Sequence, residues 1–510
     1  MTRPVVPSRI ALLLLFAAAS LPAQTTKTNV VSGRRYPRIV VRGALVVDGS
    51  GTPASGPKDI VIENNTITDV VPLDGVALSM GRARRPVGDI EIDATGKYVL
   101  PGLIDVHAHT QDERGGIPQP LQYELNIWLS CGITTVRDVG SDTKKTVELR
   151  QKSAAGEIAA PRMFVYPMFG QPKTPELARA RVREIQAATA DGIKFLGINR
   201  NIMEAAEDEA HKLGLRIAHH AGVEETTAWD DIKYGTTSIE HWYGIPDAAL
   251  DDGVQHFPAS YNYSNEGDRF RYGGHLWREA NPEKLSKVLQ AMVDAKVAWV
   301  PTLSIYEASR DIQRARTQPW FKEYLHPVLE KYFEPNPANH GSYFDHWTST
   351  DEAFWKENYR IWMAALREFG RRGGTIGVGD DAGFIYSMYG FGLIRELELQ
   401  QEAGFQPLKI IEHATADNAK ILGQEEHLGK VRPGFRADLI VVNGNPVEDF
   451  KVLYPTGIDH WVDGKMAHTG AIEWTVKDGI PYNVATLMAE VKDMVSKARA
   501  PQMKGTTGAR

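Results

Sequence analysis

Short apolar segments with the character of buried β-strands alternate with helical patterns between residues 101 and 424. Alternation of strand and helix sustained over this length predicts an α/β fold. The number of repeats fits a (β/α)8 barrel (TIM barrel), in which eight parallel strands are each followed by a helix. The alternative is an open, doubly wound sheet, but the chain has no Gly-rich phosphate-binding turn after a first strand. We therefore expect a barrel as the larger domain.

Two further β-rich segments bracket this region, at residues 25–100 and 425–485. Both alternate β-branched residues with Gly, Asp and Asn turn signals, which is typical of short strands and hairpins. We expect them to form one small β-sandwich domain from both chain ends. The barrel then spans residues 101–424, with insertions at about 247–365. Residues 486–510 are expected to form a helix followed by a flexible tail.

The first 24 residues have the pattern of a secretory signal peptide. Arg3 and Arg9 precede an apolar run from Ile10 to Leu21, and small residues follow at a cleavage site near Ala23. The apolar run is too short to span a bilayer comfortably, so we expect no membrane span after cleavage. The sequence therefore predicts an exported protein, periplasmic or secreted.

Charge and cysteine content narrow the partners and the kinds of site. The 58 Lys and Arg against 64 Asp and Glu give a formal net charge of −6, which favours neither nucleic acid nor an anionic membrane. A small-molecule substrate is the expected partner, and a homo-oligomer is left open. Cys131 is the only cysteine, so an intramolecular disulfide and a CxxC zinc site are excluded. Any metal must be held by His, carboxylate and other non-thiol groups.

Several strand-like segments end in residues that bind metals. His107 and His109 lie two apart and so share one face of a strand. His219–His220, His241 and Asp380–Asp381 end three later segments, each before a polar loop. Functional groups of barrel enzymes collect at the carboxyl ends of the strands. One such pair could be an ordinary pair of half-buried histidines, but the recurrence favours a metal site.

The segments that carry these residues also resemble a known family. PGLIDVHAH, GIKFL, AHHAG, SIEHW, GDDAG and HATADNAKILG…LGKVRPGFRADLIVV are together similar to the amidohydrolase superfamily, in particular its prolidase-like and imidazolonepropionase-related branch. The resemblance extends over nearly the whole chain after the leader. It implies a metal-dependent hydrolase with two divalent cations, usually zinc, at the rim of the barrel.

The resemblance also implies roles for individual residues. His107 and His109 would ligate the more buried metal, and His220 and His241 the more exposed one. Lys194 matches a lysine that reacts with CO2, and its carbamate, unlike an ammonium group, can bridge two cations. Burial would favour the neutral amine that this reaction needs. The alternative is a lysine paired with a carboxylate. Asp381 would be both a ligand and the catalytic proton carrier.

Two of these assignments involve adjacent pairs. The family pattern selects His220 over His219, and strand alternation agrees, because His220 shares a face with Ala218. Alternation places Asp381 on the face of two small glycines, which leaves room for metals, so we choose it over Asp380. A β-bulge at either strand end would change both arguments.

The expected reaction is attack of a metal-bridged hydroxide on an amide carbonyl, with Asp381 passing a proton to the leaving amine. The leading substrates are small peptides or N-acyl amino acids, as for a prolidase or dipeptidase. A cyclic amide, lactone or ester is the alternative, since the same metals serve any carbonyl. A binding protein that holds metals without turnover is a third reading, against which Asp381 argues. A structural ion pair under the barrel rim is expected of Arg137 and Asp138.

The insertion between strands is rich in aromatic residues, with seven of the eleven Trp between Trp242 and Trp362. It is expected either to form an aromatic lid over the site or to pack on itself. Tyr243, Arg271 and Tyr272 are the candidates for binding the substrate, because an Arg or Tyr could clamp its carboxylate. Arg269 lies close by, and at least one of the two arginines is expected to face solvent.

Overall fold

The computed structural model describes residues 29–82, 84–222, 225–262, 265–336 and 341–505. The expected signal peptide (1–24) and the end of the expected tail (506–510) lie outside the described residues. Within them, every helix is too short or too polar to cross a bilayer.

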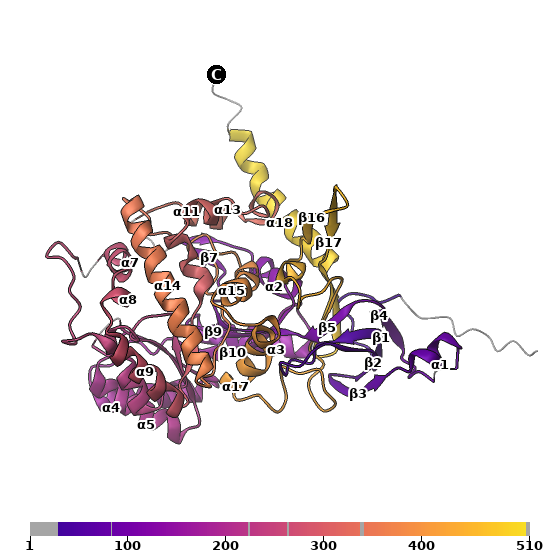
Figure 1. Cartoon of the computed structure of the whole chain (residues 1–510), viewed down its shortest axis with the longest axis horizontal. Helices are drawn as coiled ribbons and strands as arrows, with labels where there is room; N and C mark the ends of the chain where they lie inside the picture. The colour runs from indigo at the N-terminus through magenta and orange to yellow at the C-terminus, as the bar shows by residue number, and fades with distance from the viewer. Residues whose placement is uncertain (1–28, 83, 223–224, 263–264, 337–340, 506–510) are drawn as a thin grey trace, which may run out of the picture.

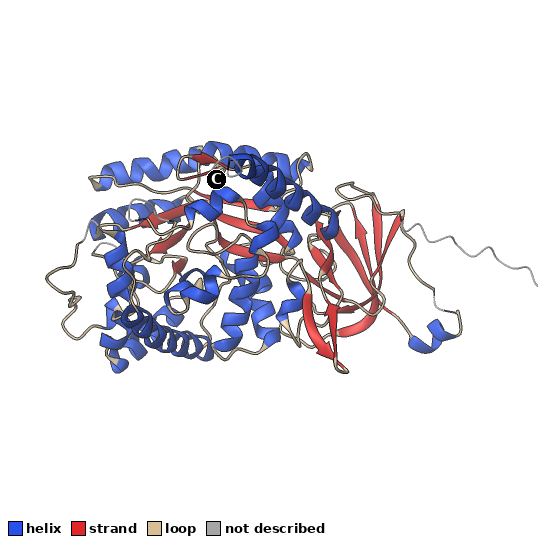
Figure 2. Cartoon of the chain, turned by 90° about the horizontal axis from the view of Figure 1, so that it is seen from above, coloured by secondary structure: helices blue, strands red, loops and turns tan. Residues whose placement is uncertain are grey.

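Strands from both ends of the chain form one mixed sheet, which lies at one end of the molecule (Figure 2). Its order is β19-β18-β15-β5-β1-β2-β3, with β4 beside β1. The link between the chain ends is the antiparallel pair of β5 and β15, in which Leu439 lies opposite Pro101. Alternating β-branched residues on one face form the core of this domain, among them Ile39, Val41, Ile60 and Val441. The strands are β1 (Arg38–Val46), β2 (Ser55–Glu63), β3 (Thr66–Pro72), β4 (Ile90–Asp93), β5 (Tyr98–Pro101), β15 (Leu439–Val442), β18 (Ile472–Lys477) and β19 (Ile480–Asn483).

The expected β-rich domain built from both ends is therefore confirmed, and its strands are hydrogen-bonded along one continuous path and share one hydrophobic core. A separate hairpin, β16 (Ile458–Val462) with β17 (Lys465–Thr469), projects from the same part of the chain (Figure 1).

The middle of the chain forms two parallel sheets. The order of the first is β10-β9-β6, and that of the second is β11-β12-β13-β14. These strands are short and completely buried or nearly so, as expected of parallel strands covered by helices. The strands are β6 (Leu103–Ala108), β9 (Ile133–Val139), β10 (Arg162–Tyr166), β11 (Gly192–Leu196), β12 (Arg216–His220), β13 (Ser238–Glu240) and β14 (Ala298–Val300).

Helices follow these strands and lie around the two sheets (Figures 1 and 2). Thr174 caps α4 by accepting a hydrogen bond from the backbone N–H of Leu177, and Pro175 occupies the first turn, as the sequence predicts. This is the TIM-barrel-like α/β arrangement expected for the larger domain. The helices are α2 (Leu121–Ser130), α3 (Thr143–Ala155), α4 (Pro175–Ala187), α5 (Arg200–Lys212), α6 (Ala228–Tyr234), α9 (Pro282–Asp294), α14 (Ser349–Arg371) and α15 (Phe391–Glu402).

Backbone hydrogen bonds outside the assigned strands join the two sheets. Lys194 N donates to the Pro167 carbonyl at 3.0 Å, which connects β11 to the chain after β10. On the other side, Gly377 N donates to the Trp299 carbonyl at 2.8 Å, so residues 375–378 run beside β14. Val106 N donates to the Val378 carbonyl at 3.1 Å and connects this segment to β6.

The insertion folds mainly into short helices whose aromatic rings pack on one another. The rings of Trp242 and Trp355 lie 5.6 Å apart, and Tyr306 stacks on Trp355 at 6.1 Å. Only part of this aromatic set faces the barrel rim, so the self-packing alternative describes most of it. The helices are α7 (Glu266–Gly273), α8 (Leu276–Glu279), α10 (Leu303–Tyr306), α11 (Ile312–Arg316), α12 (Phe321–Tyr324) and α13 (Pro327–Tyr332).

The last helix, α18 (Val484–Gly505), packs against α2 of the larger domain, where Asn126 Nδ2 donates to Glu490 Oε2 at 2.8 Å. It agrees with the expected C-terminal helix. The remaining elements are α1 (Gly75–Ser79), β7 (Glu113–Arg114), β8 (Ile117–Pro118), α16 (Pro407–Glu412), α17 (Asn418–Ile421) and the short turns η1 (Asp247–Ala249), η2 (Glu307–Ser309), η3 (His413–Asp417) and η4 (Phe450–Leu453).

Candidate metal centre

A cavity of about 300 Å³ lies where the parallel strands end. Six residues expected to hold metals line it together, although they are separated by up to 274 positions in the sequence (381 − 107). They are His107, His109, Lys194, His220, His241 and Asp381. The common position arises because five of the six lie at or near the carboxyl end of a parallel segment, and those ends meet at one rim; Lys194 lies in the middle of β11 and also lines the cavity.

His107, His109 and Asp381 form the first part of the cluster. His107 Nδ1 lies 2.6 Å from Glu240 Oε2, which leaves Nε2 directed to the cavity, 3.8 Å from Asp381 Oδ1. His109 Nε2 lies 2.9 Å from the same carboxylate oxygen. Burial, reinforced by nearby Lys194, lowers the pKa of His107 to about 4, so this imidazole is neutral and can ligate a cation at neutral pH.

His241 connects this group to His220. The His241 ring lies 4.6 Å from the His107 ring and 4.5 Å from the His220 ring, measured between centroids. Its Nδ1 contacts Thr302 Oγ1 at 2.6 Å, so Nε2 is the nitrogen left for a ligand. His107, His241 and Asp381 each offer an atom within 4.8 Å of the other two, which is close enough to hold one ion.

Two buried nitrogens of the cluster have no hydrogen-bond partner among the described residues: Lys194 Nζ and His220 Nε2. An unsatisfied polar atom in a buried site costs about 1–3 kcal/mol, so both positions need a further partner. Burial lowers the pKa of Lys194 to about 8 and that of His220 well below its usual value. The neutral His220 imidazole and the unpartnered Lys194 Nζ converge on one cavity and fit divalent cations, and the lowered pKa of Lys194 increases the share of the neutral amine that a carbamate requires.

His219 and His220 point in opposite directions, as strand alternation predicts. His219 faces the helices, where its Nδ1 lies 2.7 Å from Asp231 Oδ1 and its ring contacts Phe195. His220 faces the cavity and stacks on Tyr243 at 4.7 Å.

Asp380 and Asp381 also separate, but not by simple alternation. Asp381 has a left-handed backbone (φ 49°), and its N–H donates to the His107 carbonyl at 2.8 Å. Asp380 lies beneath, where it accepts hydrogen bonds from the backbone N–H groups of Ala382 and Gly390. Burial and the nearby Asp105 raise the pKa of Asp380 well above its usual value. The left-handed turn, which costs of order 1 kcal/mol or more for a residue other than glycine, brings Asp381 to the cavity.

A buried ion pair that the sequence did not indicate forms the floor of the site. Arg137 Nη2 donates to Glu240 Oε1 at 2.7 Å, and Arg137 Nη1 donates to Ser238 Oγ at 3.0 Å. Although burial raises the pKa of Glu240, Arg137 and His107 outweigh it and hold that pKa well below the usual value. Glu240 therefore stays ionised and fixes the orientation of His107. The sequence feature that could have indicated this role is the position of Glu240 on a strand, immediately before the expected metal ligand His241.

The expected role of Arg137 under the rim is thus supported, but its partner is Glu240 rather than Asp138. Asp138 instead accepts hydrogen bonds from the backbone N–H groups of Thr110 and Ser141, at 3.2 and 3.1 Å.

The structure corrects the position of two candidate substrate-binding residues. Arg271 points away from the cavity, where it donates to the His346 carbonyl at 2.6 Å and pairs with Asp351 at 3.3 Å. Tyr272 packs against Phe257 and Tyr261. Neighbouring residues of α7 face different sides of the helix. The side that faces the cavity depends on how α7 packs on the barrel, which the sequence does not reveal.

Arg269 of the same helix lines the cavity instead, beside Phe270 and Tyr306. Tyr243 is buried behind the rim against His220, so it supports a metal-site residue rather than lining the cavity.

Comparisons with known proteins agree with this fold. Residues 354–467 match the model of the amidohydrolase family. A dihydroorotase from Trichlorobacter lovleyi is 36% identical over 227 residues, which cover 42% of this chain and 49% of the relative. A solved Xaa-Pro dipeptidase with bound methionine superposes with a TM-score of 0.60 at 21% identity, covering 88% of this chain and 100% of the other. The chain is therefore similar to members of the amidohydrolase superfamily in part of its sequence and in its fold.

An ochratoxinase from Aspergillus niger is a further relative of this chain. It is 40% identical over 76 residues, or 14% of this chain and 16% of the relative. The solved A. niger ochratoxinase superposes with a TM-score of 0.58 at 16% identity, covering 88% and 96% of the two chains. The chain spans about half the length of the dihydroorotase and much less of the ochratoxinase. The expected resemblance to the superfamily is confirmed, and the likeness to the dipeptidase concerns the fold.

Proposed function

We propose that this protein is an exported, metal-dependent hydrolase of amide bonds in small peptides or N-acyl amino acids. The observation that carries the proposal is the convergence of His107, His109, Lys194, His220, His241 and Asp381 on one cavity. The relatives by sequence and the neighbours by fold are named as hydrolases of this superfamily, which supports an enzyme acting on carbon–nitrogen bonds.

The two parallel sheets are proposed to be parts of one closed (β/α)8 barrel. The hydrogen bonds between β11 and the chain after β10, between β14 and residues 375–378, and between those residues and β6 support a complete ring of eight. In such a barrel the active site lies at the carboxyl ends of the strands. The metal cavity occupies this position.

Two divalent cations, zinc in the first instance, are proposed to occupy the cavity. His107 and His109 would hold one, His220 and His241 the other, and Lys194, as a carbamate, would bridge both. The neutral imidazoles and the unpartnered Lys194 Nζ and His220 Nε2 support this distribution. Bound cations of this kind polarise a carbonyl and lower the pKa of water to about 7.

Asp381 is proposed to orient the attacking water, take its proton and deliver it to the leaving amine. Burial alone would raise the pKa of this carboxyl, but His107 and His109 together hold it well below its usual value, so the group stays ionised and able to accept a proton. Its contact with His109 at 2.9 Å fixes one carboxylate oxygen and leaves the other for the reacting water.

Arg269 is proposed to bind the carboxylate of the substrate, in place of Arg271 and Tyr272. It is the arginine that lines the metal cavity, and a guanidinium forms strong charge-assisted bonds to a carboxylate. Phe270 and Tyr306 provide apolar walls next to it, which exclude water and suit an uncharged side chain. These features favour a substrate with a free carboxylate over a neutral ester or lactone.

A panel of dipeptides, N-acyl amino acids, cyclic amides and lactones tests the proposal on the full chain, with bound metal measured in parallel. We expect turnover of the carboxylate-bearing amides. Lys194→Ala should lose metal and activity together. Lys212→Ala removes an exposed lysine that pairs with Asp208, and this control should keep both.

Two other outcomes would select the alternatives. Turnover of lactones or cyclic amides alone would favour those substrates on the same site. Metal binding without any turnover would favour the binding protein. Export is tested separately: fractionation should place the protein outside the cytoplasm, with an N-terminus near residue 24.

A further inference from the structure

A second cavity, of about 640 Å³, lies between the barrel loops and the β-rich domain. It is more than twice as large as the metal cavity and has a volume typical of ligand sites, which occur preferentially between domains. Its walls come from helices α10 to α12, from residues 385–395, and from the region of η4 and the β16–β17 hairpin. None of the metal-site residues lines it.

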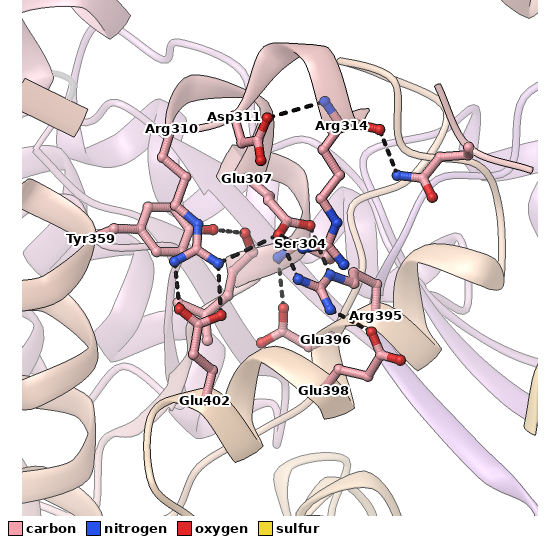
Figure 3. A network of polar contacts seen from close by, with 12 residues as sticks. Ser304, Glu307, Arg310, Asp311, Arg314, Tyr359, Arg395, Glu396, Glu398 and Glu402 are labelled. Carbon is pink, nitrogen blue, oxygen red and sulfur yellow. Dashed lines mark hydrogen bonds and ion pairs between the residues drawn. The ribbon is translucent and has the colours of Figure 1, made fainter. Parts of the chain in front are cut away.

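Charged groups at the floor of this cavity neutralise one another (Figure 3). Glu307 accepts hydrogen bonds from Arg395 Nη2 at 2.6 Å and Nε at 2.8 Å, and from Arg314 Nη1 at 2.8 Å. Arg395 also pairs with Glu398, whose other oxygen lies 3.2 Å from Lys451 Nζ. The floor is therefore a compensated network rather than a site of one charge.

Carboxylates at the margin of the cavity are also paired. Glu323 accepts from Lys492 Nζ at 2.8 Å, and Asp459 lies 2.7 Å from His468 Nδ1. Arg314 differs, because its side chain is 45% exposed and only Nη1 has a hydrogen-bond partner among the described residues. The donors left over in the lining therefore include the Nε and Nη2 groups of a guanidinium, which favour an anion.

Aromatic rings form the adjoining wall. The Trp320 ring lies 4.7 Å from the Phe391 ring and 4.8 Å from the Tyr454 ring, while those two rings are 5.8 Å apart. Phe391 and Tyr454 are buried, whereas Trp320 is only partly buried and leaves part of its surface to the cavity. Such a wall favours a flat apolar group, since stacked or tilted aromatic pairs gain energy beyond the area that they bury.

We propose that this second cavity binds a small molecule that has an aromatic ring and an anionic group. The ring would lie against Trp320 and the anion would accept hydrogen bonds from Arg314. The site is separate from the metal centre, and its occupation does not depend on the proposed activity. The two cavities meet at Ile385, which lines both of them.

Calorimetric titration of the full chain with indole-3-acetate tests the proposal, with tryptamine as the probe of the same ring and opposite charge. We expect indole-3-acetate to bind and tryptamine to bind at least tenfold more weakly. Arg314→Gln should weaken binding of indole-3-acetate at least tenfold, because it removes the charged donor. Arg316→Gln, the same change on the same helix at a residue outside the cavity lining, should not.

Arg269→Gln separates the two cavities, because Arg269 lines only the metal cavity. Binding that depends on Arg269 and not on Arg314 would overturn the proposal, as would equal binding of tryptamine or no binding of indole-3-acetate. Trp320→Phe gives a second readout that retains an aromatic ring. It should keep the affinity within about threefold, whereas Trp320→Ala should weaken binding at least tenfold because the ring partner is lost, and equal binding by the two variants would place the probe elsewhere.

Discussion

The two cavities of this protein differ in how their polar groups are satisfied. In the larger cavity, Glu307 accepts hydrogen bonds from three arginines, and the other lining carboxylates each have a basic side chain as partner. In the metal cavity, Lys194 Nζ and His220 Nε2 are buried without a hydrogen-bond partner in the described part of the chain. Both cavities are charged, but the larger balances its carboxylates with basic side chains, whereas the smaller brings buried nitrogens together without an acceptor among the described residues.

This difference separates a structural network from a site prepared for an ion. Paired charges stabilise their own arrangement and need nothing further, whereas buried unpaired nitrogens are costly until a ligand reaches them. Backbone strain also distinguishes the metal cavity, because His241, Thr302 and Asp381 at its rim all have left-handed backbone conformations. Such conformations cluster at functional sites, where the surrounding fold holds them.

The largest expected effect separates the two adjacent aspartates. Asp381→Asn should lower kcat by about 10²–10⁴-fold, the usual contribution of a general acid or base. Asp380→Asn should cost much less, because Asp380 does not line the metal cavity and accepts hydrogen bonds from backbone N–H groups beneath it. Steady-state kinetics on one substrate measure both, and a greater loss for Asp380→Asn would reverse the assignment.

A matched pair of substitutions compares how much the buried carboxylates Glu240, below the metal cavity, and Glu307, below the larger cavity, contribute to stability. Glu240→Gln leaves the completely buried Arg137 without a countercharge and should lower the free energy of unfolding by about 3–5 kcal/mol. Glu307→Gln should cost less, about 1–2 kcal/mol, because Arg310 and Arg395 keep Glu402 and Glu398 as acceptors and the Arg314 side chain is 45% exposed. Urea unfolding of the metal-free proteins gives both values, and equal losses would remove the distinction.

Substrate binding should depend on one cavity only. Arg269→Gln should raise KM for substrates with a free carboxylate by about 10–100-fold, as expected for loss of a charged hydrogen bond. The same substitution should leave KM for carboxyl-amidated analogues unchanged, and Arg314→Gln should leave both unchanged. If Arg314→Gln raised KM for the carboxylates instead, the substrate would occupy the larger cavity.

Reloading of the metal site should depend on pH through Lys194. Its pKa of about 8 lies below the usual lysine value because of burial, so the reactive neutral amine rises from about 10% at pH 7 to about 90% at pH 9. The rate at which chelator-treated protein regains activity with zinc, at a fixed CO2 concentration, should therefore rise roughly tenfold over this interval. A rate that fell or stayed constant would contradict carbamate formation at Lys194.

Much of this molecule could be predicted from local sequence patterns. Strand and helix alternation indicated the larger domain, and the period of two along β12 separated His219 from His220. Asp381 was chosen by the same alternation, although its position depends on a left-handed turn that alternation does not reveal.

Features that depend on long-range packing could not be predicted in this way. The bond between Arg137 and Glu240 joins two strands that are not neighbours in a sheet, and Thr302 approaches His241 only when β14 lies beside β13. The choice between Arg269 and Arg271 depends on how α7 docks, because helical residues two apart face different sides.

The central claim is that Lys194 and the histidines together hold two cations. Anomalous scattering from crystals of the protein prepared with zinc, combined with metal analysis, measures this directly. We expect two ions per chain, one beside His107 and His109 and one beside His220 and His241, with the extended side chain of Lys194 between them. A single ion held by histidines alone, with an unmodified Lys194, would contradict the account.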